Sequence, residues 1–414
     1  MPWIPDPTRL PNRSSPKSPP PHDPRMADSE PLGHRQGHDR QCQIDDEPSA
    51  DDTHVYVIAA HGDTVLFRRT RVPRPTLQEE LRCHRPGYDY FVYKAAAGEP
   101  PSLSLLPTCL IPIMERGYEG YINNYPTARE LDQSDTGVLR RGKDELLVAQ
   151  LKVADEAPFN TAELCVLRPG RSEWELKTAV PIVHHRTGKA HDLQMWQDTN
   201  VAVPVGDRFL CWVNFDCSTF LLCDMADHED EDRGPTKIRY VRLPVKAVPP
   251  RDDEDYDDEY EGQPSWLYYR TIGAAGPDAA RFVSIDNRCC CGAHVIKSSC
   301  EHSSSAFMVT MWTLTLTTAG DQPMKWVKES VLDCEEFWSL VACKGLSRDV
   351  YLTCPVVSSG NPDVVCFIAR EGESLWTVEI DVRRKTLISV NPCPDHPQKC
   401  VTYVNNLPAK LHRP

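Results

Sequence analysis

The feature that most constrains this chain is a strand–turn–strand pattern that recurs along it. Each copy has a short apolar run, a polar turn, and a second short run that contains an aromatic residue. Short runs of this composition, bounded by Gly, Pro, Asn or Asp, are typical of paired β-strands. Four copies begin at Glu163, Phe220, Phe307 and Val364, and two similar hairpins begin at Val55 and Tyr90.

These units predict a mainly β fold of repeated antiparallel hairpins. We expect a β-propeller-like body in which each sheet packs its face on the next, and a two-sheet β-sandwich is the alternative. Helices should be few and short, with one at Cys334–Val341 and a helical turn at 127–131. Four tryptophans are expected to wedge between sheets as core residues: Trp174, Trp212, Trp312 and Trp376.

Composition divides the chain into a tail and a body. Residues 1–53 are rich in Pro and charge and poor in large apolar residues, which predicts a disordered tail before a β-rich domain over 54–405. Two acidic loops within that domain, near 226–236 and 250–263, are expected to be disordered because like charges repel and stay solvated. They hold most of the net charge of −14, so the remainder shows no basic face for nucleic acid.

The compartment is inferred from what the chain contains. No apolar run approaches the roughly 20 residues that span a bilayer, and the first residues lack a secretory signal pattern. We therefore expect an intracellular protein of the cytoplasm, the nucleus or both, with a plastid as the alternative and Met26 as an alternative start to Met1. The 17 cysteines are odd in number and irregularly spaced, which predicts buried thiols without structural disulfides.

A Cys-rich loop over 287–305 contains the candidate metal ligands. Zinc prefers four tetrahedral Cys or His ligands, and this loop offers Cys291, His294, Cys300 and His302. Their spacing departs from that of paired zinc knuckles, so a loop with unligated thiols is the alternative. No nucleophile elbow, dinucleotide fingerprint or phosphate-binding loop occurs, and the sequence assigns no catalytic or cofactor-binding residues.

The most specific motif lies in the middle of the chain. It reads Cys211-Trp-Val-Asn-Phe-Asp-Cys-Ser-Thr-Phe-Leu-Leu-Cys-Asp224, followed by Arg239-Tyr-Val-Arg-Leu-Pro244. This resembles the signature of a plant family, expanded in grasses, that is titled only domain of unknown function 1618. Members typically show Gly-Trp-Val-Asp-Leu, then Ile-Leu-Leu-Cys-Asp, then Arg-Tyr-Val/Ile-x-Leu-Pro. The resemblance extends over about 55–400 and implies no activity, cofactor or catalytic residue.

This chain departs from the family signature in its central turn. Cys211 stands where members have Gly, Asn214 where they have Asp, and Ser218-Thr219 where they have Arg-Gly. Glycine adopts positive φ at little cost, and a β-branched residue does not. The tight turn is therefore in question here.

Three functions are compatible with these observations. The first is a non-enzymatic interaction scaffold that presents loops to a protein partner, with neither nucleic acid nor membrane involved. The second is a hydrolase-type enzyme with its site in the central channel of a propeller, which requires ionisable side chains that converge from several units. The third is a zinc-binding protein that uses the loop at 289–302.

Overall fold

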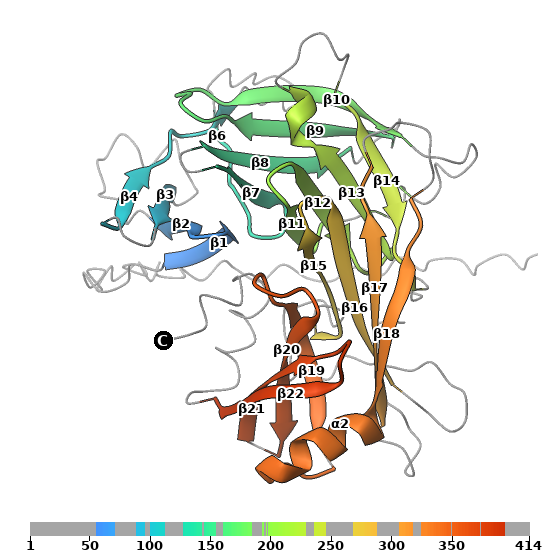
Figure 1. The fold of residues 1–414 in the computed structure, drawn as a ribbon. Helices are drawn as coiled ribbons and strands as arrows, with labels where there is room; N and C mark the ends of the chain where they lie inside the picture. Colours follow the sequence, from blue (N-terminus) through green and yellow to red (C-terminus); the bar gives the residue numbers. More distant parts are fainter. Residues whose placement is uncertain are drawn as a thin grey trace, which may run out of the picture. The chain divides into compact units, whose positions relative to one another are not determined.

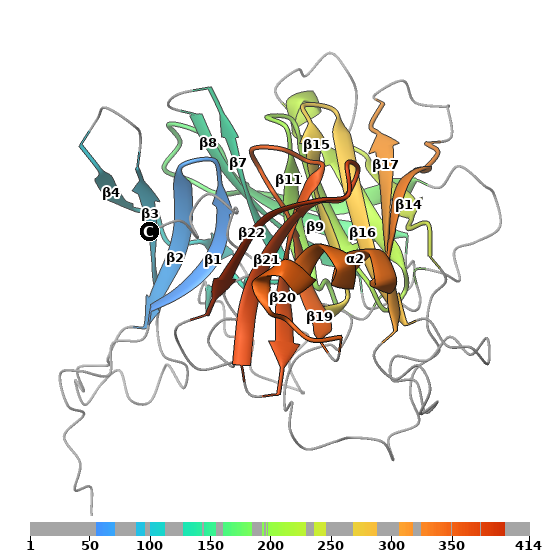
Figure 2. The same cartoon turned by 60° about the horizontal axis from the view of Figure 1, so that its bottom comes forward.

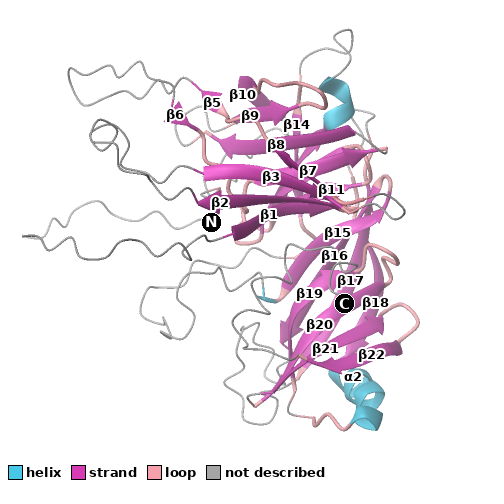
Figure 3. Cartoon of the chain, turned by 90° about the vertical axis from the view of Figure 1, so that its left-hand side faces the viewer, coloured by secondary structure: helices cyan, strands magenta, loops and turns pink. Residues whose placement is uncertain are grey.

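The structure is a computed structural model that describes the strands and their nearest connections. It covers residues 55–70, 88–95, 100–111, 127–142, 145–154, 160–183, 193, 196, 198–228, 236–245, 268–287, 306–317, 324–348, 350–372 and 374–393. The predicted tail at 1–53, the acidic segment at 250–263 and residues 288–305 of the Cys-rich loop lie outside these residues. Strands dominate what is described (Figure 3).

Twenty of the 22 described strands form five units of four antiparallel strands, and strands consecutive in sequence pair within each unit (Figure 1). The other two, β5 and β6, form a separate two-stranded sheet. The first unit is β1 (Val55–His61), β2 (Thr64–Thr70), β3 (Tyr88–Lys94) and β4 (Ser102–Leu105). The second is β7 (Thr136–Arg141), β8 (Glu145–Val153), β9 (Thr161–Leu167) and β10 (Glu175–Val183). The third is β11 (Val201–Val205), β12 (Phe209–Asn214), β13 (Thr219–Asp224) and β14 (Ile238–Arg242).

The last two units are β15 to β22. The fourth unit is β15 (Arg270–Gly276), β16 (Ala279–Asn287), β17 (Phe307–Thr315) and β18 (Val327–Asp333). The fifth is β19 (Tyr351–Val357), β20 (Val364–Glu371), β21 (Ser374–Asp381) and β22 (Thr386–Pro392). All six hairpins predicted from the sequence are present as antiparallel pairs.

The arrangement of the units is propeller-like, as the repeats predict. The first strands of successive units contact one another, from β1 to β7, β11, β15 and β19, and Figure 2 shows several of them side by side. Each unit therefore presents a sheet face to the next, as propeller blades do. The second and third units also share one eight-stranded sheet, because β10 pairs in parallel with β14 at Ile182–Ile238 and Val183–Arg239.

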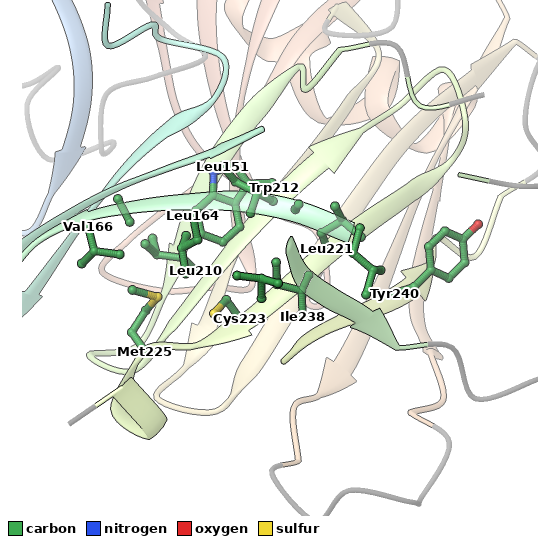
Figure 4. Packing of buried hydrophobic residues seen from close by; sticks show 14 of the residues in the cluster. Leu151, Leu164, Val166, Leu210, Trp212, Leu221, Cys223, Met225, Ile238 and Tyr240 are labelled. Atoms are coloured by element: carbon green, nitrogen blue, oxygen red, sulfur yellow. The ribbon is translucent and has the colours of Figure 1, made fainter. Parts of the chain in front are cut away.

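Trp212 lies at the centre of the core between the second and third units (Figure 4). Its side chain is fully buried, and its indole N–H donates to the carbonyl oxygen of Asp135 at 2.7 Å. Leucines from β8 and β9 face it on one side and residues of β13 and β14 on the other. A buried indole with a satisfied N–H is the core wedge that the sequence predicts.

The other three predicted tryptophans also pack against cores between units. Each is partly buried, and each lies against a different cluster: Trp174 at the first and second units, Trp312 at the third and fourth, and Trp376 at the fourth and fifth. Among the described residues, no hydrophobic cluster joins the fifth unit to the first.

The predicted helix is present as α2 (Cys334–Val341) and follows β18 directly. Asp333 caps it by accepting from the backbone N–H of Glu335 at 3.0 Å, while the Glu336 carboxylate accepts from the Asp333 N–H at 3.1 Å. This reciprocal capping box satisfies donors that the helix start leaves free. Its apolar face, with Phe337 and Val341, is buried in the core of the last two units.

The predicted helical turn at 127–131 is wrong. Thr127 and Ala128 form β6, which pairs with β5 (Leu110–Ile111). A partner strand distant in sequence supplies the backbone hydrogen bonds that a local helix would otherwise make. The acidic loop near 226–236 also begins with structure, since Met225–His228 is a 3₁₀ helix.

The structure also answers two further expectations, one about disulfides and one about the turn at Ser218. Cys393 is disulfide-bonded, so the expectation of no structural disulfide is wrong. The compartment in which a protein works does not determine which thiols its fold brings together.

The turn in question at Ser218 forms, with Ser218 at φ 51°. Arg270 holds it by donating to the Ser218 hydroxyl at 3.2 Å and to the Phe215 carbonyl at 3.1 Å.

Candidate interaction edge

The first unit buries one face, and no described residues form a core over the other. Strand alternation points Ile58, Leu66 and Val92 toward the second unit, where they are buried. The opposite face carries Phe67 and Phe91, whose rings stack at 5.5 Å. This face lies at the end of the series of units, and no core of the described residues covers it.

The strand β4 extends this open face to the edge of the sheet. It reads Ser-Leu-Ser-Leu, and all four residues are exposed. Leu103 pairs with Tyr93, and Leu105 pairs with Phe91. Because paired residues share a face, the two leucines continue the aromatic row, and each leucine is 60% exposed.

The backbone of β4 has free hydrogen-bonding groups on its outer side. The N–H of Leu106 donates to the carbonyl of Tyr90 at 2.8 Å, which makes this a hydrogen-bonded pair of the β3–β4 ladder. Hydrogen-bonded pairs alternate with non-hydrogen-bonded pairs in an antiparallel ladder. The backbone N–H and C=O groups of Ser104 and Ser102 therefore also point toward β3. The N–H and C=O groups of Leu103 and Leu105 therefore point away from β3. Among the described strands, none pairs with this edge.

Prolines limit the open edge to a short strand. Pro100 and Pro101 precede β4 and Pro107 follows it closely. Native proteins use such residues to restrict pairing at exposed edges, because proline has no N–H to donate. The edge therefore offers one short segment with two outward N–H groups, in place of a long strand that would pair without selectivity.

A network of charged and polar groups attaches the first unit to the segment that leads into the second unit. Arg68 donates to the carboxylate of Glu130 at 2.7 Å, and its guanidinium lies over the rings of Tyr56 and Tyr88. The hydroxyl of Tyr90 accepts from the backbone N–H of Leu131 at 2.8 Å, and burial raises the pKa of Tyr90 to about 12. Tyr90 therefore stays neutral and acts as a structural acceptor.

Gln150 extends this network into the second unit. Its side-chain amide donates to the Glu130 carbonyl at 2.9 Å and to the Asp135 carboxylate at 2.8 Å. Burial raises the pKa of the Asp135 carboxyl above its usual range, although Gln150 and Thr136 donate to it. The backbone carbonyl of the same aspartate accepts from Trp212, so the network connects the edge to the central core.

The described part of the chain also contains an open hollow of about 430 Å³. It lies at the turns between β11 and β12 and between β15 and β16, and two of its lining residues are Asp207 and Asp278. Arg208, which also lines it, is held by two hydrogen bonds to Asp224, at 2.7 and 2.6 Å. Two carboxylates in an open hollow do not form a converging catalytic set, and the hydrolase interpretation stays a prediction.

The zinc candidates Cys291, His294, Cys300 and His302 lie outside the described residues, so zinc binding stays a prediction. Within the described ranges, no group of three or more His, Cys, Asp or Glu side chains is placed to hold a metal ion. No helix in those ranges combines the length and apolar character needed to cross a membrane.

Sequence reasoning identified the strand that forms the edge and missed its role. The Ser-Leu-Ser-Leu alternation signals a strand with one apolar face. Whether that strand lies at an edge depends on its neighbours in space. The flanking prolines were the available signal, since they commonly mark edge strands.

Comparison with solved structures gives only remote likenesses. A post-proline cleaving enzyme from Rickettsia typhi is 9% identical with a TM-score of 0.30, over 83% of this chain and 37% of that one. An exo-β-1,3-galactanase from Phanerochaete chrysosporium is 7% identical with a TM-score of 0.27, over 82% of this chain and 59% of that one. A functionally unknown protein from Desulfotomaculum acetoxidans is 8% identical with a TM-score of 0.26, over 82% and 86%.

These scores carry no argument about function, and this chain spans less than two thirds of the first two structures. No curated protein matches the sequence. The family predicted from the motif at 211–224 does match, and its sequence model covers residues 212–366, from β12 into β20. Over this segment the chain is similar to the DUF1618 family, whose description is protein of unknown function.

Proposed function

We propose that this protein is a non-enzymatic interaction scaffold that binds an extended segment of a partner protein along β4. The observation that carries the proposal is the outer side of β4, where the backbone groups of Leu103 and Leu105 point away from β3. An added strand would satisfy these groups, as in peptide recognition by β-strand addition.

The chemistry of the edge defines the partner segment. Its backbone must be extended and free of proline at the pairing positions, because the outward C=O groups of β4 need N–H donors, which proline lacks. Alternate apolar side chains would lie beside Leu103, Leu105 and Tyr93, which are all exposed. The net charge of −14 favours a segment that carries Lys or Arg, because complementary charge raises association rates.

The rigidity of the first unit supports this role. A scaffold gains affinity when its binding surface is already ordered, since less conformational entropy is lost on binding. The Arg68–Glu130 ion pair and the hydrogen bond between Tyr90 and Leu131 hold the unit against its neighbour. The edge is therefore presented on an ordered sheet.

A phage-displayed library of random linear peptides, selected on the full chain, tests the proposal. Enriched peptides should carry apolar residues at alternate positions together with Lys or Arg. Their binding should be lost in Leu105→Pro, which removes an outward N–H and leaves the hydrogen bonds to β3 in place.

Leu105→Ala is the matched control, because it removes the same side chain and keeps the N–H. It should bind the peptides more weakly than the wild type and more tightly than Leu105→Pro. Binding that is equal in Leu105→Pro and the wild type would contradict the proposal, as would a selection that enriches no peptide.

A further inference from the structure

Two buried cysteines from distant parts of the chain lie side by side. Cys109, just before β5, and Cys165, in β9, are 2% and 0% exposed, and their Sγ atoms are 3.5 Å apart. They are 56 residues apart in sequence. Trp174 and Leu176 pack against the pair and cover it. A disulfide needs the sulfurs at about 2.05 Å, so a small side-chain movement joins them.

A buried cation lies next to this pair. The backbone N–H of Arg129 donates to the Cys109 carbonyl at 2.8 Å, which places the arginine beside the thiols. Its guanidinium donates to Gln150 and to the carboxylate of Glu163, the latter at 3.1 Å. The third nitrogen, Nη2, is buried without a hydrogen-bond partner among the described residues. The positive charge of Arg129 favours the thiolate form of both cysteines.

The two thiols differ in how readily each loses its proton. The two sulfurs share one hydrogen bond, in which either can be the donor. When Cys109 donates, this hydrogen bond lowers the pKa of Cys165 below its ordinary value, and the charge of Arg129 acts in the same direction. The same hydrogen bond and burial raise the pKa of Cys109. With this direction of the hydrogen bond, Cys165 is the nucleophile of the pair and Cys109 holds the proton.

We propose that Cys109 and Cys165 form an oxidisable dithiol that hydrogen peroxide converts into a disulfide. The Cys165 thiolate attacks one peroxide oxygen and breaks the O–O bond, which gives a sulfenic acid and a hydroxide that takes up a proton to become water. The Cys109 sulfur then attacks the sulfenic sulfur. The S–S bond forms, the S–O bond breaks, and the Cys109 proton leaves with the hydroxyl as a second water. Two thiols and one peroxide thus give one disulfide and two waters.

The other described thiols provide the contrast. Burial raises the pKa of Cys354 and of Cys366 to about 12. Neither thiol has a cation among the groups that shift its pKa. Cys211 and Cys223 are also buried, and they pack into cores on opposite faces of their sheet. Peroxide should therefore select the Cys109–Cys165 pair among the buried cysteines.

The test is peptide mapping of the full folded chain after exposure to hydrogen peroxide. A Cys343→Ser background removes the thiol that is exposed among the described cysteines and simplifies the map. The expected product is a peptide pair linked through Cys109 and Cys165 that a reductant separates. Cys354→Ser should leave the yield of this pair unchanged.

Two sets of variants test the mechanism. In Cys109→Ser, peroxide should leave a sulfenic acid at Cys165 that dimedone labels, because no resolving thiol remains. Arg129→Gln should slow formation of the linked pair on the order of tenfold, the effect of one pKa unit on the thiolate fraction. Arg129→Lys keeps the charge and should be slowed less.

Peroxide that oxidises other cysteines of the folded chain while Cys109 and Cys165 remain free thiols would overturn the proposal. A linked pair that forms equally fast in Arg129→Gln would overturn the role of the cation. Should Cys109→Ser fail to fold, the wild-type map still decides, because the linked peptide requires no variant.

Discussion

The strands β12 and β4 differ completely in burial, although both belong to four-stranded units of the same kind. All six residues of β12 are buried, with Leu210 and Trp212 in the core shared with the second unit and Cys211 and Val213 in the core shared with the fourth. All four residues of β4 are exposed. The third unit has a neighbour on each side, whereas the first has one described neighbour.

The difference teaches that position in the series determines what a unit can do. A unit between two others uses both faces for stability, so its strands become continuously apolar. The first unit has a face and an edge that no other described unit covers. Each of the following changes tests this contrast between the buried third unit and the exposed first unit.

The largest effect is expected for Trp212→Ala. The substitution leaves a cavity between two units and removes the donor to the Asp135 carbonyl. We expect the free energy of unfolding to fall by about 3–5 kcal/mol, measured by denaturant titration. A loss below about 1 kcal/mol would show that this core collapses around the cavity.

A smaller loss of unfolding free energy is expected for a substitution at the turn between β11 and β12. Gly206 has φ 62°, and an added Cβ would collide with the carbonyl oxygen of Pro277 in the fourth unit. Gly142, at the turn between β7 and β8, has φ 53° and open space around it. Gly206→Ala should therefore lower the unfolding free energy by about 1–3 kcal/mol more than Gly142→Ala. Equal losses would mean that backbone strain alone matters and that the units separate freely.

The attachment of the first unit should depend on pH through His61. Its Nδ1 accepts from the Arg140 N–H at 2.9 Å, and burial, then the Arg140 charge, lower the His61 pKa, which the Asp207 charge opposes. The folded state therefore favours the neutral form of the His61 ring. Its stabilisation is therefore present above the unfolded pKa of about 6.5 and is lost as the pH falls through the lower folded value.

The wild type should therefore lose stability on acidification from about pH 7 to about pH 5, measured as melting temperature. His61→Asn keeps an acceptor for Arg140 without a titrating ring and should flatten this dependence. An unchanged slope in the variant would assign the effect to other groups.

The smallest effect is expected at the edge itself. Leu103 is 60% exposed, so Leu103→Ser should change the unfolding free energy by less than about 0.5 kcal/mol. The measurement is the same denaturant titration that is used for Trp212→Ala. A loss as large as those of core variants would show that β4 packs against the body and is not a free edge.

Local signals explain which elements could be predicted. The helix at Cys334–Val341 has both an apolar face and capping residues next to it in the chain. The hairpins at Val55 and Val364 alternate between strand formers and turn residues within short distances. Each of these elements makes its defining hydrogen bonds with its own neighbours in sequence, so propensity and pattern point to the same structure.

The features that the sequence did not predict share a different cause. Thr127 pairs with Ile111, and the thiol of Cys109 meets that of Cys165 from a strand more than fifty residues away. The edge of β4 is defined by the lack of a described neighbour, which is a property of the assembled units. Neither of the two contacts is encoded in a local period or spacing, and the flanking prolines are the one local signal for the edge.

The short parallel pairing between β10 and β14 has a consequence for local unfolding. Among the described strands, backbone hydrogen bonds cross from the second unit to the third only there. Packing, hydrogen bonds and ion pairs of side chains hold the other units to their neighbours. The second and third units should therefore open together, as one cooperative block. Amide protons of β12 and β13 would then exchange last, and those of the first unit would exchange earlier, without unfolding of the block.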